Sequence, residues 1–543
     1  MPRTHHATIR LRTGVSLLAV GSIIAAGLAV RPATSARAAG GTLLIARDLA
    51  DGKTMDPGHF YEFTSNAMAT NCYDTLVTFK GTDTAHPQPD LATSYTISSD
   101  AKVFTFHLRH GVRFSTGNTL TANDVVFSYR RLEYLGDNPA FLIAAATDIR
   151  ALDTYTVRIT LGAPDVSFLA ALADNNFGVL DSKVVKAHGG DDSTQAAKRD
   201  KATSFLDAQS VGTGTFQLTN WTRNVQIVLT RNPYYWGQRA PMDKIVFQNQ
   251  SDSATQRLLI QRGQVDVAEG IDLQGAQSLR NTPSVQVVTG NTLDLLYLAM
   301  TTSANISKPL ADKRVRQAVR YAIDYSGILN GLLHGIGTRP NSMIPVGMLG
   351  NSTSTNNSLL IQQNLTKARA LLKAAGYSNG FSLKLSYDTK PSTFDGVLFE
   401  PLVNKVQNDL ARIGIKVTLD PQVDAVLLPA YRAQKLQMLL YNWGVDFPDP
   451  NDYAGPFSPG GGPAKRMYYT NDKNLTSIVT KADSISDSTQ RAALYRTVQQ
   501  TWLDESPWVG LVQPQNIIVL GKNVKGYVYS PILPANFRTA YTQ

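Results

Sequence analysis

The pattern of apolar and polar positions divides the chain into short strands and amphipathic helices. Residues 103–109 alternate strictly, so Phe104, Phe106 and Leu108 share one face of a predicted strand. Apolar or alternating runs predict further strands, among them residues 42–46, 154–161, 225–229, 244–247, 293–300 and 415–419.

Helices are predicted between these strands. Thr121-Ala-Asn-Asp124 has the form of a capping box, with Asp in the place of Glu, and predicts a helix that ends at Gly136. Apolar residues at a spacing of 3.6 predict one long helix over residues 312–335. Other predicted helices begin at Thr366, span residues 398–413 or begin at Asp487. Because strands and helices alternate along the chain, the fold class is predicted to be α/β.

The segment 438–453, MLLYNWGVDFPDPNDY, holds the most informative candidate site. Its apolar start predicts a buried strand, which the turn-rich stretch after Trp443-Gly444 ends. Asp446 follows the strand end, where ligands of open α/β sheets bind. There a carboxylate among aromatic side chains could bind a cationic group, by a hydrogen bond worth about 1.5–3 kcal/mol. The alternative is that Asp446 only begins the following turn.

The first 38 residues have the features of an export signal. Arg3, Arg10 and Arg12 form a basic start, residues 14–30 are uncharged and mostly apolar, and Ala36-Arg37-Ala38 offers a cleavage site. The apolar run has 17 residues, the lower limit for a membrane span, so an uncleaved anchor is the alternative. The chain is therefore expected to be exported, by cleavage or with an N-terminal tether.

The length of the chain indicates how many domains it has, and its charge excludes one class of partner. The chain has 543 residues, enough for two or three domains. Its formal net charge is +10, five of which lie in the first 38 residues, and no long basic run follows. This charge distribution argues against nucleic acid as the partner.

Motifs for catalysis or metal binding are absent from the sequence. There is no Gly-x-Ser-x-Gly, no His-Glu-x-x-His and no Walker loop. Gly212-x-Gly214 lacks the third glycine of a dinucleotide loop and predicts a turn. After the first 38 residues, His107 and His110 are the only close histidine pair, and on a strand their rings point to opposite faces. The single cysteine, Cys72, is predicted to be buried.

Residues 91–132 resemble a known family. The block LATSYTISSDAKVFTFHLRHGVRFSTGNTLTANDVVFSYRRL is similar to the most diagnostic block of the family 5 solute-binding proteins of ABC importers, the peptide/nickel group. Further matches keep the family's order. They include VGTGTF at 211–216, RNPYYW at 231–236, RGQVDV at 262–267, KRVRQA at 313–318 and GIKV at 414–417.

The resemblance implies a two-lobed class II periplasmic-binding-protein fold with an extra domain on the first lobe and the ligand enclosed between the lobes. The expected parts are the signal peptide 1–38, first-lobe segments 39–82 and 207–290, the extra domain 83–206, the second lobe 291–508 and a C-terminal first-lobe segment 509–543. Thr215 departs from the Pro that the family often has, and no lipoprotein cysteine is present.

The resemblance also gives Asp446 a role. In peptide-binding members, an Asp three residues after a Trp receives the ligand's α-ammonium group, and Trp443-Gly444-Val445-Asp446 matches that spacing. The ligand-binding residues are therefore expected to be Asp446, Trp443, Gly444, Tyr441 and Phe447.

The expected function is that of an extracytoplasmic, monomeric receptor that captures a peptide and delivers it to the membrane permease of an ABC importer. No cofactor, metal or catalytic residue is expected. The alternatives are the same fold binding a sugar, an opine-like solute or chelated nickel, and, with less support, a secreted hydrolase.

Overall fold

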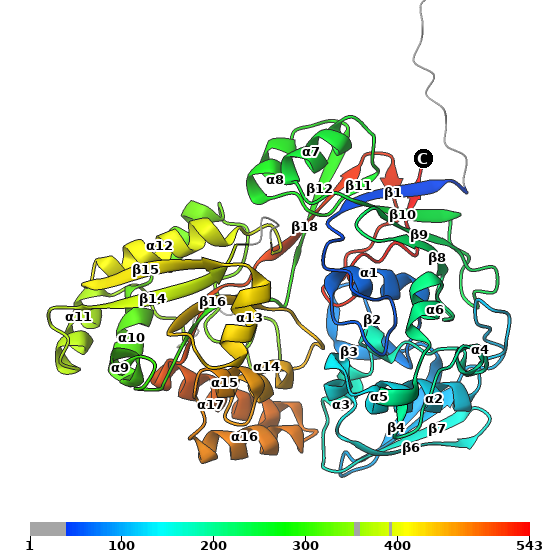
Figure 1. Ribbon diagram of the computed structural model, residues 1–543, viewed down its shortest axis with the longest axis horizontal. Helices are drawn as coiled ribbons and strands as arrows, with labels where there is room; N and C mark the ends of the chain where they lie inside the picture. The colour runs from blue at the N-terminus through cyan, green and yellow to red at the C-terminus, as the bar shows by residue number, and fades with distance from the viewer. Residues whose placement is uncertain (1–39, 352–358, 390–393) are drawn as a thin grey trace, which may run out of the picture. The chain divides into compact units, whose positions relative to one another are not determined.

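The structure is a computed structural model that describes residues 40–351, 359–389 and 394–543. The predicted signal peptide, 1–38, lies outside the described residues. Within the described part, the strands form a seven-stranded, a five-stranded and a four-stranded sheet together with two small two-stranded ribbons (Figure 1). No helix in that part is long and apolar enough to cross a membrane.

The seven-stranded sheet draws its strands from three distant parts of the chain. Its order is β12-β18-β11-β1-β10-β9-β8. In β1 the apolar residues of the predicted strand pair in parallel with both β10 and β11, and β18 inserts antiparallel between β11 and β12. The strands are β1 (Thr42–Arg47), β8 (Phe216–Thr222), β9 (Gln226–Arg231), β10 (Lys244–Asn249), β11 (Val267–Ala268), β12 (Val285–Asn291) and β18 (Gln515–Gly521).

The five-stranded sheet has the order β15-β14-β16-β13-β17. All six residues of β13 are buried, which explains its unbroken apolar run. Helices from the same part of the chain pack beside the sheet (Figure 1). These strands and helices are β13 (Leu295–Met300), β14 (Phe381–Asp388), β15 (Ile415–Gln422), β16 (Met438–Trp443), β17 (Trp508–Val512), α10 (Lys313–Ala322), α11 (Leu365–Ala374) and α12 (Phe399–Ala411).

The four-stranded antiparallel sheet, β4-β5-β7-β6, lies in the region predicted as an extra domain. In β5, Phe104, Phe106 and Leu108 are buried, as the alternation predicts. Thr121 and Asp124 form the predicted capping box, and Gly136 ends α2 in the left-handed conformation. The elements are β4 (Ala92–Ile97), β5 (Val103–Leu108), β6 (Ala146–Asp153), β7 (Thr156–Leu161), α2 (Ala122–Leu135) and the ribbon β2 (Val77–Lys80) with β3 (Asp83–Pro89).

Shorter helices and a second ribbon complete the described chain. They are α1 (Phe63–Cys72), η1 (Asn138–Leu142), α3 (Phe168–Ala171), η2 (Asn175–Phe177), α4 (Ser182–Ala187), α5 (Ala196–Arg199), α6 (Thr203–Ala208), α7 (Ser253–Gln261), α8 (Leu273–Leu279), α9 (Lys308–Ala311), η3 (Gly327–Leu332), α13 (Asp424–Arg432), α14 (Asn451–Phe457), α15 (Gly462–Arg466), α16 (Lys473–Asp483), α17 (Ser488–Glu505), β19 (Val524–Lys525) and β20 (Tyr541–Thr542). Asp487 caps α17 by accepting a hydrogen bond from the backbone N of Gln490, as predicted.

The chain passes twice between the seven-stranded and the five-stranded sheet. The two connecting segments join β12 to β13 and β17 to β18. Hydrogen bonds link the two segments to each other. Gln513 Nε2 donates to the carbonyl of Thr292 at 2.7 Å, and Thr292 Oγ1 donates to the carbonyl of Pro514 at 2.8 Å. The expected boundary at 508/509 lies inside β17, so we propose that the lobes meet at residues 292–294 and 513–514.

Two helix predictions were wrong in detail. The single helix over 312–335 is two, because α10 ends at Ala322, the next residue Ile323 is extended, and η3 begins at Gly327. Asp324 makes the break: its backbone N donates to Asp409 of α12 at 2.9 Å, and its carboxylate accepts from the N of Gly327. Asn364, not Thr366, caps α11 through the backbone N of Lys367.

Gly214 lies against the end of α1, next to the buried Cys72. A Cβ at Gly214 would come within 2.4 Å of the carbonyl carbon of Cys72. Cys72 is fully buried, as predicted, and burial raises the pKa of its thiol to about 12.

Substituting Gly214→Ala is expected to lower the free energy of unfolding by about 1–3 kcal/mol, because the methyl group has only rigid backbone to displace. Urea denaturation would measure the loss. Gly331→Ala is the matched control, since a Cβ there meets nothing within 4 Å. Equal stabilities for the two variants would contradict the prediction.

Candidate functional site

Asp446 follows the end of β16, and its carboxylate is bonded to a residue from a distant part of the chain. The hydroxyl of Tyr61 lies 2.6 Å from Oδ1 and 2.8 Å from Oδ2. Tyr61 lies two residues before α1, and in the sequence it falls between β1 of the seven-stranded sheet and the strands of the four-stranded sheet. The bond therefore joins the part of the chain that carries the five-stranded sheet to the part that carries the other two.

A second carboxylate lies behind Asp446. Asp452, in α14, is only 2% exposed, and its Oδ2 accepts from the backbone N of Asp446 at 3.2 Å and from Trp443 Nε1 at 3.4 Å. Burial and the neighbouring charge of Asp446 raise the pKa of Asp452 well above its ordinary value. Burial raises the pKa of Asp446 to about 6, although the Tyr61 hydrogen bond acts to lower it.

Three further carboxylates surround this pair. Asp294 Oδ1 accepts from the backbone N of Val445 at 2.8 Å, and burial and the adjacent Asp395 raise its pKa well above the ordinary value. Burial also raises the pKa of Asp395. Burial, with a smaller contribution from Asp446, raises the pKa of Asp174 to about 7.

No basic side chain compensates these carboxylates. Among the described residues, no Lys, Arg or His nitrogen forms a salt bridge with Asp446 or with the other four. Partly buried carboxylates without a counter-charge favour the binding of a cation, because its charge replaces the lost hydration. In the described part, no cluster of His, Cys, Asp and Glu has the arrangement of a metal site.

The other predicted site residues divide into two groups. Trp443 bonds to Asp452 and packs its ring edge-on against Phe457, with centroids 5.1 Å apart. Gly444 lies beside Phe63, whose ring would be 3.2 Å from a Cβ at that position. These two residues adjoin Asp446.

Tyr441 and Phe447 make packing contacts instead. The hydroxyl of Tyr441 donates to Asp424 of α13 at 3.2 Å, and its ring is 5.9 Å from that of Tyr431. Phe447 is 9% exposed and belongs to the hydrophobic core of the four-stranded sheet. In the described structure, no hydrogen bond joins the Tyr441 side chain to the Asp446 carboxylate, and the Phe447 ring has no group that could form one.

The sequence prediction did not include Tyr61, Asp452, Asp294, Asp395 or Asp174 as site residues. Tyr61 is 385 positions from Asp446, so no local pattern connects them. Asp452 lies in the same segment and could have been found there. Asp449, which is closer in sequence, forms a buried ion pair with Arg491 at 2.5 and 2.8 Å.

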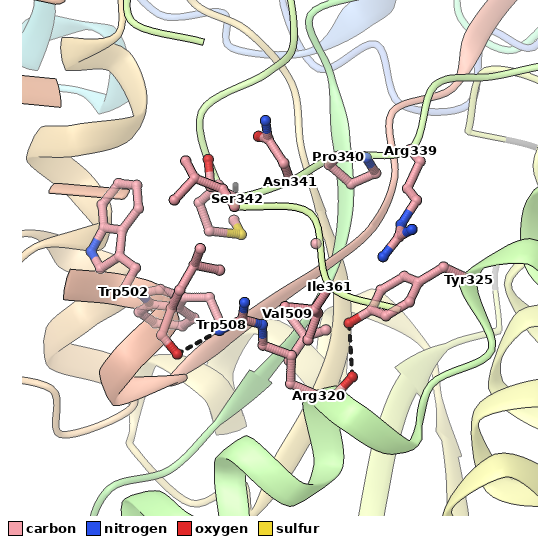
Figure 2. Close-up of a pocket in the computed structure, with 14 residues that line it drawn as sticks. Arg320, Tyr325, Arg339, Pro340, Asn341, Ser342, Ile361, Trp502, Trp508 and Val509 are labelled. Atoms are coloured by element: carbon pink, nitrogen blue, oxygen red, sulfur yellow. Dashed lines mark hydrogen bonds between the residues drawn. The ribbon is translucent and has the colours of Figure 1, made fainter. Parts of the chain in front are cut away.

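A separate cavity lies between α10, α17 and β17 (Figure 2). Arg320 Nη1 donates across it to the carbonyl of Leu503 at 2.6 Å, and the Tyr325 hydroxyl donates to the Arg320 carbonyl at 3.0 Å. Its volume is only about 20 Å³. Ligand pockets usually measure about 300–1,000 Å³, so this cavity is internal packing space.

Comparison with known proteins identifies the group to which these features belong. Residues 86–465 match the model of the bacterial extracellular solute-binding proteins, family 5. The probable D,D-dipeptide-binding periplasmic protein DdpA of Escherichia coli (strain K12) is 29% identical over 503 residues, with 91% of this chain and 93% of the relative covered. Heme-binding protein A of Haemophilus influenzae is 27% identical, with 88% of each chain covered.

A solved structure confirms the predicted fold class. The periplasmic binding protein DppA from Helicobacter pylori, in complex with the peptide STSA, is 28% identical and superposes with a TM-score of 0.78, with 93% of this chain and 98% of that chain covered. The fold is therefore the two-lobed class II periplasmic-binding-protein fold. Together with the match over most of its length, this shows that the chain belongs to the bacterial extracellular solute-binding proteins, family 5.

Proposed function

We propose that the protein is the extracytoplasmic receptor of an ABC importer, that it captures peptides and that Asp446 binds the ligand's α-ammonium group. The observation that carries the proposal is the Asp446 carboxylate, which has no basic partner among the described residues and contacts Tyr61, a residue from the other part of the fold. A carboxylate accepts about four hydrogen bonds, so Asp446 has acceptor capacity beyond Tyr61 for an ammonium group.

The surrounding charge supports a cationic ligand over a neutral one. Asp452, Asp294, Asp395 and Asp174 lie near Asp446 without a basic partner in the described structure, and burial raises the pKa of each of them. An ammonium group would favour the ionised forms of these carboxylates and be attracted by them, whereas a neutral sugar would not. Two similar proteins agree with this choice: DdpA is named as a probable D,D-dipeptide-binding protein, and the Helicobacter pylori protein is in complex with the peptide STSA.

A ligand bound to both Tyr61 and Asp446 would also contact both parts of the fold. Such a ligand would stabilise the closed conformation, in which Tyr61 and Asp446 lie together, because it binds that conformation better than an open one. We propose that this bound form, outside the cytoplasmic membrane, is delivered as a monomer to the membrane permease.

A thermal-shift screen of peptides, sugars and nickel chelates tests the proposal. A ligand at 100 times its Kd adds about 2.7 kcal/mol to the free energy of unfolding. We expect peptides with a free amino terminus to raise Tm and their N-acetylated forms to have little effect, because acetylation removes the positive charge.

The variant Asp446→Asn keeps the shape of the side chain and removes its charge, so we expect it to lose the peptide-induced shift. Asp504→Asn is the matched control, since Asp504 is exposed at the end of α17. Stabilisation by sugars alone, or by acetylated and free peptides alike, would rule out the amine-binding role of Asp446.

A further inference from the structure

Two phenylalanines and one tyrosine are exposed beside the candidate site. The chain has 19 phenylalanines, and Phe63 and Phe141, each 50% exposed, are the only ones of them that the structure leaves exposed. Tyr61 is 41% exposed. Large apolar side chains left in contact with water are informative when they lie together next to a ligand site.

Tyr61 and Phe63 adjoin the segment that carries Asp446, and Phe141 packs against Tyr61. The hydroxyl of Tyr61 contacts the Asp446 carboxylate, while its ring packs edge-on against Phe141 of η1, with centroids 5.9 Å apart. Phe63, the first residue of α1, reaches Gly444 and lies 6.1 Å from the ring of Phe394. The exposed aromatic rings therefore lie directly beside the Asp446 carboxylate.

A carboxylate with aromatic rings beside it is suited to the first residue of a peptide, which carries both the ammonium group and a side chain. In a peptide, the side chain of the first residue is attached to the same carbon as the ammonium group. An ammonium group on Asp446 therefore brings the first side chain close to Tyr61 and Phe63. Exposed aromatic rings favour an apolar neighbour, because burying the rings removes apolar surface from water.

We propose that Tyr61, Phe63 and Phe141 form a subsite for an apolar side chain, aromatic by preference, on the first residue of the bound peptide. The inference rests on the proposed function, since it takes Asp446 as the position of the ammonium group. The inference adds a preference for an apolar side chain on the first residue of the peptide. The sequence alone did not indicate this preference.

Isothermal titration of the wild-type protein with Phe-Ala, Ala-Phe and Ala-Ala tests the subsite. We expect Phe-Ala to bind about 10–100-fold more tightly than Ala-Ala, in line with the discrimination that apolar pockets achieve. Ala-Phe should gain less, because its aromatic ring is on the second residue. Equal affinities for Phe-Ala and Ala-Ala would overturn the inference.

The variant Phe141→Ala should bring the Phe-Ala to Ala-Ala affinity ratio close to one. Phe141 is half exposed, so the variant is expected to fold, and Phe141→Leu should restore part of the ratio. Tyr234→Ala, which removes another exposed aromatic ring, is the control and should keep the wild-type ratio. A wild-type ratio in Phe141→Ala would also overturn the inference.

Failure of the subsite can be distinguished from failure of the proposed function. If free peptides bind, Asp446→Asn abolishes binding and the first side chain makes no difference, only the subsite is wrong. If no peptide with a free amino terminus binds, the proposed function and the subsite both fail.

Discussion

Replacing Arg131 by methionine is expected to lower the free energy of unfolding by about 3–5 kcal/mol, the cost of leaving buried charges unpaired. Arg131 lies on α2 with a side chain that is 1% exposed. Its guanidinium donates to both oxygens of Asp56 at 2.7 and 2.6 Å, and to both oxygens of Asp200 at 2.7 and 3.0 Å. The substitution would leave two buried carboxylates without a counter-charge.

The pKa of Asp56 also indicates that Arg131 stabilises the ionised carboxylate. Burial raises this pKa, but the charge and hydrogen bonds of Arg131, with smaller contributions from His59 and the backbone N of Gly58, hold it below its ordinary value. Without Arg131, burial would favour the protonated form, so the loss of stability should be smaller at acidic pH than at neutral pH. Urea denaturation at both pH values would measure the difference.

Arg130→Met is the matched control, because Arg130 is the neighbouring residue on α2 and is only half buried. Its substitution should change stability by less than about 1 kcal/mol, as surface substitutions usually do. The prediction would fail if Arg131→Met were no more destabilising than this control. A variant that also carries Asp56→Asn and Asp200→Asn should recover part of the loss.

The affinity for a cationic ligand is expected to fall about tenfold for each pH unit below 6, because protonation of Asp446 competes with the ligand. The pKa of Asp446 in the ligand-free protein is about 6, raised from its ordinary value by burial. Above that pH the carboxylate is ionised and can bind an ammonium group. Titration calorimetry with one peptide between pH 4.5 and 8 would give the profile.

The same ionisation affects the stability of the empty protein in the opposite direction. Because the pKa is higher in the folded than in the unfolded chain, the folded protein holds the proton more tightly. This contribution to stability is present below about pH 4 and is lost as pH rises through 6. A bound ammonium group offsets the loss at neutral pH.

The variant Asp446→Asn separates this site from the other carboxylates. It should bind the peptide weakly, with little change in affinity across the pH range. Asp504→Asn should keep the wild-type profile. An affinity that stays constant from pH 8 to pH 5 in the wild-type protein would show that the ligand does not depend on an ionised Asp446.

The sequence by itself determined those helices and strands that are stabilised by residues close together in the chain. The alternation over 103–109 predicts which residues of β5 are buried, and Thr121, Asp124 and Gly136 predict both ends of α2. A capping box and a left-handed glycine act within one helical turn, so no distant residue is needed to form them. The motifs that keep the family's order predicted the fold, and they also led to the proposal that Asp446 binds the ligand.

The tertiary structure decided what depends on residues far apart in the chain. It divided the predicted helix over 312–335, because Asp409 of α12 binds the backbone at Asp324. It also placed Tyr61 on Asp446, across 385 positions, and gathered the other carboxylates around that residue. Periodicity and spacing describe only neighbours along the chain, whereas pKa shifts and the balance of charge depend on which distant side chains share one low-dielectric space.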